Sequence, residues 1–249
     1  MAIMRTANPA LSAKAFEGYR ISGLEEKMTI QGTVNKTALL LLLVFMSAFY
    51  TWGKFSVDNP SIVQPWIITG AIAGLILAVI TIFKKTAAPI TTPLYALAEG
   101  LVLGGVSAFF DTMFPGIVIQ AVALTFGTLF ALLVAYKSGL IKATENFKLG
   151  VTAATGAVFL VYLIDFIMRF FSSGMTFLHG NGLLGIGISV VIVVIAALNL
   201  VLDFDFIENA AENGAPKYME WYGAFGLIVT LVWLYLEILR LLSKLRSSN

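Results

Sequence analysis

Apolar residues along this chain gather into seven long runs, which short polar segments separate. A helix needs roughly 20 apolar residues to cross a bilayer core of about 30 Å. The runs cover about residues 37–52, 65–83, 93–110, 115–136, 149–168, 183–202 and 221–242. The pattern therefore predicts seven transmembrane helices. The first run is short, so we expect the flanking Lys36 and Lys54 to extend to the membrane surface.

Proline and glycine add detail to this pattern. Pro65, Pro93 and Pro115 each stand at the start of a run, where the missing backbone N–H loses no helical hydrogen bond. Glycines four residues apart, at 70–74 in the second run and 100–104 in the third, are typical of helices that pack closely in membranes. We therefore expect a tightly packed helical bundle.

The composition confirms the membrane class and narrows the chemistry. Of the 249 residues, 59% are hydrophobic and 12% are charged, and the mean hydropathy is +0.90. Soluble domains carry about 25% charged residues. The net charge of +2 is no sign of nucleic-acid binding, because the cations lie in the loops between apolar runs, and we expect no nucleic-acid partner. The lack of cysteine excludes disulfides and thiolate metal sites. The single histidine, His179, lies in a glycine-rich loop, where we expect it to be solvated. No nucleophile–base arrangement is evident, so we expect no enzyme activity.

Lysine and arginine are distributed unevenly between the two sides. The polar residues 1–35 and the alternate loops carry most of the cations, whereas the opposite loops hold Lys54 and Arg169. Cytoplasmic loops of membrane proteins are enriched in these residues. The sequence therefore predicts a cytoplasmic N-terminal tail, 1–35, followed by one transmembrane domain, 36–246.

The C-terminal cations disagree with this orientation. Seven crossings place Arg240, Lys244 and Arg246 on the outer side, against the usual bias. Either the C-terminal end tolerates these cations, or the last helix does not cross in the ordinary way.

Acidic residues interrupt the apolar runs near the sixth span and within the third. Asp203 and Asp205 stand two residues apart, so on a helix only one of them can face the bundle interior. Asp205 and Glu208, followed by Glu212, would form either an acidic vestibule that attracts cations or an ordinary hydrated helix end. Glu99 in the third span would either line an ion path or accept a hydrogen bond from a neighbouring helix.

The last run contains a carboxylate that needs a partner, because a charge in lipid costs about 2.5–3.5 kcal/mol on insertion scales. One partner for Glu237 is Arg240, three residues further along the helix. The other is Asp203. Two acids in a water-poor site cannot both ionise cheaply, so such a pair would share one proton and act as a proton switch. A separate salt bridge is expected between Asp165 and Arg169, which are four residues apart.

Three stretches resemble motifs of the Bax inhibitor-1 / YccA family, also called the transmembrane Bax inhibitor motif family. They are the Glu-Gly motif in 93–104, the acidic segment in 202–214 and the Leu-Tyr-Leu-Glu motif in 234–242. The similarity runs over about 35–246, and the opening Asn8-Pro9-Ala10-Leu11 with Phe16 resembles a prokaryotic branch, which implies a bacterial inner membrane. The resemblance implies an all-α fold, with two three-helix layers around a central C-terminal helix.

For function, the resemblance implies a pH-sensitive calcium leak gated by a carboxylate pair, here Asp203 with Glu237. These oxygens would hold Ca²⁺ only in transit, so no resident cofactor is expected. This chain departs from the family in having Glu at 237, in a 34-residue separation between the two acids and in lacking an arginine in the second span. With a turn near Gly214, the acids meet only if the hairpin is asymmetric. The alternative function is a non-transporting regulator that binds a membrane protease or another integral protein.

Overall fold

A computed structural model describes residues 26–169, 171 and 175–248 of the chain. The tail residues 1–25, with the resemblance at 8–11 and Phe16, lie outside this part. Seven long helices are each long and apolar enough to cross a membrane, which confirms the predicted spans. They are α1 (Ile30–Lys54), α2 (Gln64–Phe83), α3 (Ala88–Met113), α4 (Ile117–Lys137), α5 (Glu145–Met168), α7 (Leu183–Glu212) and α8 (Met219–Ser247). The short α6 (Thr176–His179) and the 3₁₀ turns η3 (Pro60–Val63) and η4 (Lys85–Ala87) lie between them.

The first helix begins earlier than its apolar run. Thr29 caps α1 by accepting a hydrogen bond from the backbone N–H of Gly32 at 2.9 Å, which starts the helix at Ile30. The first span therefore has 25 residues and is not short, and it includes residues expected in the tail.

The prolines agree with prediction at one position and differ at two. Pro65 lies in the first turn of α2, as expected. Pro93 lies inside α3, because Pro89 takes the first turn of that helix. Pro115 lies in the turn before α4, where Gly116 adopts a φ of 79°. A positive φ favours glycine because it has no Cβ to clash.

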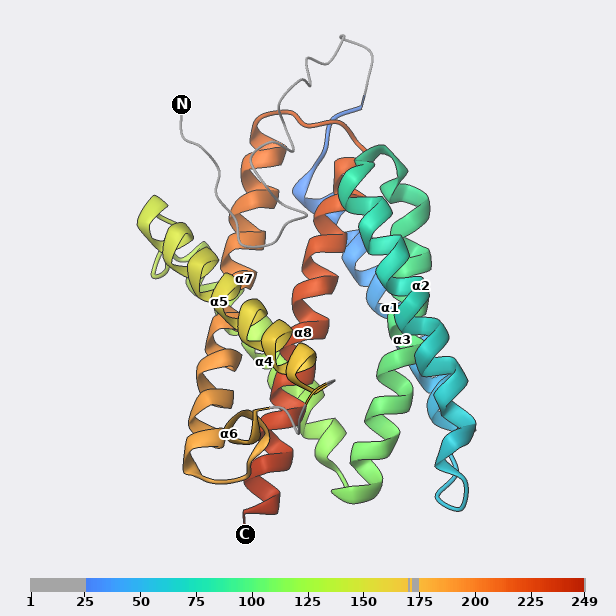
Figure 1. Ribbon diagram of the computed structural model, residues 1–249. Coiled ribbons are helices and arrows are strands. Elements are labelled where there is room, and N and C mark those ends of the chain that lie inside the picture. Colours follow the sequence, from blue (N-terminus) through green and yellow to red (C-terminus); the bar gives the residue numbers. More distant parts are fainter. Residues whose placement is uncertain (1–25, 170, 172–174, 249) are drawn as a thin grey trace.

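The helices form two layers around a central one (Figure 1). In one layer, α3 packs against both α1 and α2, and in the other, α7 packs against both α4 and α5. Helix α8 contacts α1, α3, α4 and α7 and is the most buried of the spans. This arrangement confirms the expected two three-helix layers around a central C-terminal helix.

Close helix packing occurs at the predicted glycines. A Cβ on Gly104 of α3 would overlap the carbonyl of Ala48 on α1. A Cβ on Gly70 of α2 would lie 2.6 Å from the carbonyl oxygen of Ala98 on α3. Glycine at these positions lets the three helices of this layer approach backbone to backbone.

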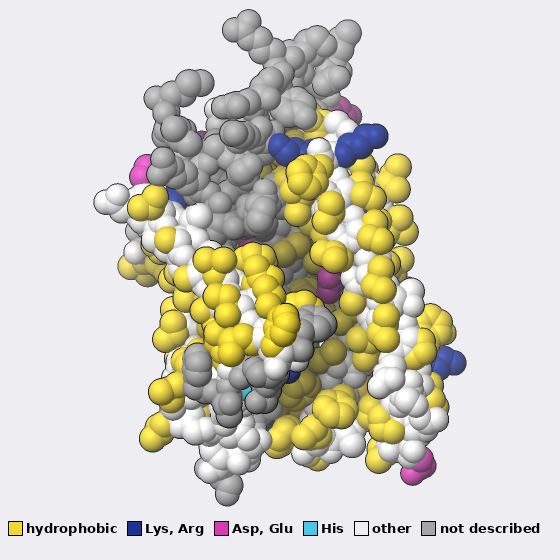
Figure 2. Space-filling view, viewed as in Figure 1, with side chains coloured by type: hydrophobic (Ala, Val, Ile, Leu, Met, Phe, Trp, Pro, Cys, Tyr) yellow, Lys and Arg dark blue, Asp and Glu magenta, His cyan; other side chains and the backbone are white. Residues whose placement is uncertain are grey.

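The bundle has two ends, which we name from the chain. The near end holds the start of α1 and the α7–α8 loop, and the far end holds the C-terminus of α8 and the short α6 (Figure 1). At the near end the backbone of 26–28 pairs with this loop, since the N–H of Met28 donates to Ala215 at 2.7 Å and that of Lys217 donates to Glu26 at 2.9 Å. Hydrophobic side chains cover most of the flank in Figure 2, and charged ones lie mainly towards the ends.

Candidate functional site

Helix α5 is the most loosely attached helix of the layer formed by α4, α5 and α7. Its inner face carries polar side chains. The helix lies oblique to α7 and α8 (Figure 1) and packs mainly against α7. Most of its apolar side chains, such as Phe159 and Phe166, are exposed on the bundle surface, where lipid would surround them. The opposite face carries a polar residue every seven positions, at Lys148, Thr155 and Tyr162, with Arg169 following the last turn. A spacing of seven keeps these side chains on one stripe of the helix.

The first contact of this stripe is an ion pair with α7. Lys148 Nζ lies 2.7 Å from Asp205 Oδ2, and it lies 3.5 Å from Glu145 Oε1 one turn away. Both members of the α5–α7 pair are largely withdrawn from solvent, with side chains 9% and 17% exposed. Asp205 therefore serves to hold α5 against α7.

The second contact lies deeper in the membrane and is uncharged. Asn199 of α7 donates its amide to Thr155 Oγ1 of α5 at 2.8 Å, and also to the carbonyl of Ile195 at 2.8 Å. Asn199 is 2% exposed. A buried amide needs such partners, because an unpaired one costs about 1–3 kcal/mol.

The third contact reaches the central helix. The hydroxyl of Tyr162 lies 2.9 and 3.0 Å from the two carboxylate oxygens of Glu237 on α8. The same carboxylate accepts from Arg240 at 3.1 Å and from the indole of Trp233 at 3.3 Å. Arg240 also donates to the tyrosine hydroxyl. We call the contacts Lys148–Asp205, Thr155–Asn199 and Tyr162–Glu237 the α5 latch.

The expected pair of Asp203 with Glu237 is not formed. Ile207 of α7 touches Gly223 of α8, since a Cβ built on that glycine lies 3.1 Å from Ile207 Cγ1, and this contact fixes the register of the two antiparallel helices. Asp203 is fully buried and lies one turn before Ile207 on α7, so it lies at about the same depth as Leu227, one turn after Gly223 on α8. Glu237 lies ten residues beyond that level, or about 15 Å. The hairpin turns near Gly214, and its two arms place the acids at different depths. Glu237 pairs with Arg240 instead, the other partner that the sequence offered.

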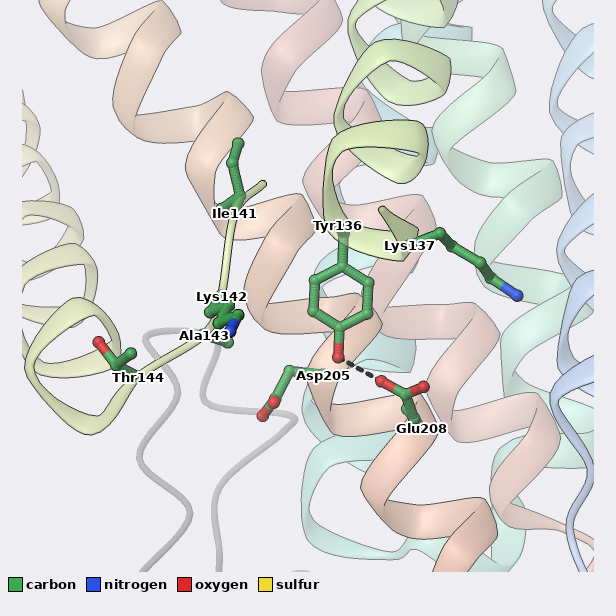
Figure 3. Close-up of a pocket in the computed structure, with 8 residues that line it drawn as sticks. All are labelled: Tyr136, Lys137, Ile141, Lys142, Ala143, Thr144, Asp205 and Glu208. Atoms are coloured by element: carbon green, nitrogen blue, oxygen red, sulfur yellow. Dashed lines mark hydrogen bonds between the residues drawn. The ribbon is translucent and has the colours of Figure 1, made fainter. Parts of the chain in front are cut away.

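The acidic cluster at the near end lines a hollow of about 400 Å³ between α4, the α4–α5 loop and α7 (Figure 3). Tyr136 reaches from the end of α4 and donates a hydrogen bond to Glu208. Asp205 and Glu208 thus share one pocket, but each of them is already bonded. Its lining residues are Tyr136, Lys137, Ile141, Lys142, Ala143, Thr144, Asp205 and Glu208. Because lysines share this lining, the pocket is mixed in charge, and the acidic vestibule stays a prediction.

Glu99 lies in the other layer. It is half-buried, and its Oε1 would lie 3.1 Å from a Cβ on Gly74 of α2. Tyr95, one turn earlier on the same helix, packs its ring edge-on against Phe225 of α8. Glu99 therefore faces α2 and does not join the acids of α7 and α8.

Asp165 and Arg169 form the predicted salt bridge, with Arg169 Nε 3.0 Å from Asp165 Oδ2. His179 was expected to be solvated, and this expectation is incomplete. Its Nε2 lies 2.8 Å from the same carboxylate oxygen of Asp165. The histidine thus connects α6 to the end of α5.

Sequence reasoning missed Glu220, which lies at the start of α8. This carboxylate is fully buried at the near end and accepts from both the N–H and the hydroxyl of Thr29 at 2.9 Å. Lys36 of α1 also binds it, and Lys217 lies 3.3 Å away. An acid directly before the last run, three residues after a lysine, was the available signal. Glu220 fastens the start of α1 to α8.

The C-terminal cations that opposed the predicted orientation are engaged within the protein. Arg240 pairs with Glu237, and Arg246 donates to the carbonyl of Pro115 at 2.8 Å and to Gln120 at 3.1 Å. Lys244 is 3% exposed and is bonded to α6 and α7. The last helix crosses the bundle in the ordinary way, and protein contacts hold these charges.

A model of the family described as Bax inhibitor 1 like matches residues 8–247. This range includes all the helices and every contact of the α5 latch. No curated protein matches the chain, and neither does any solved structure.

Proposed function

This chain belongs to the Bax inhibitor 1 like family and is an integral membrane protein, and we propose that it forms a pH-sensitive leak pathway for cations, calcium above all. The observation that carries the proposal is the α5 latch. A peripheral helix is fastened to the α7–α8 pair by three polar contacts, two of which use a carboxylate. Such a helix can move when its contacts are weakened.

The pathway runs along the interface that α5 covers. Oxygen atoms of Thr155, Asn199, Tyr162 and Glu237 line this interface, and hard oxygen ligands are the ones that Ca²⁺ prefers. Asp203 lies one turn from Asn199 on the same buried face of α7. Movement of α5 away from this face would expose these oxygens to a passing ion.

Acid would open the pathway in this mechanism. Protonation of Asp205 removes the negative charge that holds Lys148, and protonation of Glu237 removes the one that holds Arg240 and aligns Tyr162. Hydrogen bonds to charged groups contribute about 1.5–3 kcal/mol each, against about 1 for neutral ones. The latch therefore weakens as the pH falls, and cation flux rises. This switch replaces the shared proton between Asp203 and Glu237.

The cation bias of the loops supports an orientation with the near end in the cytoplasm. The C-terminal cations do not weigh against it, because they are bound within the protein. A bacterial inner membrane is the location that we infer from the prokaryotic resemblance.

The test is calcium flux through purified protein in liposomes that contain a calcium indicator, measured over a range of pH. We expect more flux than from empty liposomes, rising as the pH falls. Asp203→Asn should lower the flux several-fold but leave the rise with acid in place, because Asp203 lines the pathway and is not part of the latch, whereas Asp58→Asn, in an exposed loop, should leave both unchanged. If vesicles with and without wild-type protein leaked equally at every pH, the chain would not be a leak, and the regulator hypothesis would be favoured.

A further inference from the structure

Lys244 of α8 holds its ammonium group in a cage of oxygen atoms at the far end of the bundle. Its Nζ lies 2.7 Å from the carbonyl oxygen of Leu178, 3.0 Å from that of Gly185 and 2.8 Å from the hydroxyl of Ser189. An ammonium has three N–H donors. All three are therefore used, and the side chain is 3% exposed.

The three oxygens come from elements that this lysine does not belong to. Leu178 lies in the short α6, where a carbonyl of the last turn lacks an intrahelical donor. Gly185 and Ser189 lie one turn apart in α7, and both are buried. Backbone carbonyls and a hydroxyl that converge on one point form a coordination site for a cation. Here the chain itself supplies that cation.

We propose that Leu178, Gly185 and Ser189 form a binding site for a monovalent cation, which Lys244 fills as a tethered ion. The charge of the cation follows from the ligands. All three are neutral, whereas calcium sites use carboxylates. The carboxylate of α8 that is nearest in sequence, Glu237, lies two turns away and pairs with Arg240.

The site has a consequence for transport, which rests on the proposed function. Ser189 lies on the same buried face of α7 as Asn199 and Asp203. Lys244 would close the far end of this face to other cations until its ammonium withdraws.

The site is tested by removing the tethered ion and supplying free ones. The Tm of purified Lys244→Ala is measured at equal concentrations of potassium, sodium, methylammonium, calcium or choline chloride. In choline, which is too large for the cage, we expect a Tm at least about 4 °C below that of the wild type. Half or more of this loss should be recovered in at least one small monovalent cation. Recovery should be absent when Ser189→Ala is added, and Lys54→Ala, an exposed lysine at the same end, should show no cation-specific change.

An equal Tm of Lys244→Ala in choline and in every small monovalent cation would overturn the proposal, and so would recovery in calcium alone. If the variant does not fold in choline, the same comparison is made on the yield of monodisperse protein purified in each salt. No recovery of yield in any monovalent salt would then overturn it. Because neither readout measures flux, a failure of the leak and a failure of this site are distinguishable.

Discussion

Tyr162 on α5 and Glu237 on α8 are joined by a forked hydrogen bond, in which one hydroxyl lies 2.9 and 3.0 Å from the two carboxylate oxygens. This contact connects the helix at the edge of the bundle to the one at its centre. It also gives the carboxylate of the last span a partner from another helix, besides Arg240 of its own. In this conformation Glu237 therefore holds α5 against α8, and a change in its charge would weaken that contact.

Removal of the tyrosine hydroxyl should open the leak at neutral pH. Tyr162→Phe keeps the ring but deletes the group that bonds Glu237 and Arg240, which should cost about 1–3 kcal/mol of stability. Because α5 is then held less firmly, calcium flux into liposomes at neutral pH should rise several-fold, and the rise with acid should become smaller.

Tyr50→Phe is the matched control, since Tyr50 is an exposed tyrosine on α1 that packs edge-on against Trp66. Its flux should equal that of the wild type. Unchanged flux and unchanged Tm in Tyr162→Phe would show that the forked bond does not restrain α5.

Loss of the near-end contact, Lys148–Asp205, should also raise the calcium flux at neutral pH. Asp205→Asn removes the charge that faces Lys148, a largely buried lysine, and should lower the free energy of unfolding by about 1.5–3 kcal/mol. It should also raise the flux at neutral pH, because it mimics the protonated carboxylate. Glu212→Gln changes an exposed acid at the end of the same helix and should alter stability by less than about 0.5 kcal/mol. If both variants gave the same flux–pH curve, Asp205 would have no part in the pH response.

Two glycines of α1 test the role of Glu220. A Cβ on Gly32 would overlap the carboxylate of Glu220, whereas a Cβ on Gly53 would meet nothing within 4 Å. Gly32→Ala should therefore destabilise the protein by about 1–3 kcal/mol through overpacking, despite alanine's better helix propensity. Gly53→Ala should be neutral or slightly stabilising. Thermal unfolding in detergent measures both, and an equal Tm for the two variants would mean that the carboxylate does not pack against the start of α1.

Much of the fold could be predicted from the sequence, because each transmembrane helix corresponds to a long apolar run. The helix ends were harder. The start of α1 depends on the cap at Thr29, which lies before the apolar run, and the start of α3 depends on Pro89 rather than on Pro93. Hydropathy reports where lipid contact begins, whereas capping decides where the helix begins.

The site was predicted only in part. The pairs Glu237–Arg240 and Asp165–Arg169 follow from positions three and four apart on one helix, and both are present. Contacts between helices depend on register, which a single sequence does not fix. The stripe of Lys148, Thr155 and Tyr162 was visible as a seven-residue spacing within an apolar run, and this signal was overlooked. The predicted pairing of Asp203 with Glu237 was wrong because the two acids are separated from the turn near Gly214 by different lengths of helix, so they lie at different depths in the membrane.

The central claim is that α5 must leave α7 for cations to pass, and a cross-link between the two helices tests it most directly. The natural chain has no cysteine, so Thr155→Cys with Asn199→Cys introduces a single reactive pair where the two side chains are hydrogen-bonded at 2.8 Å. A short bifunctional thiol reagent that can be cleaved by reduction should abolish the acid-stimulated calcium flux of the double variant, and reduction should restore it. Either single variant, treated in the same way, should keep its flux. Full acid-stimulated flux in protein shown by mass spectrometry to be completely cross-linked would contradict the account.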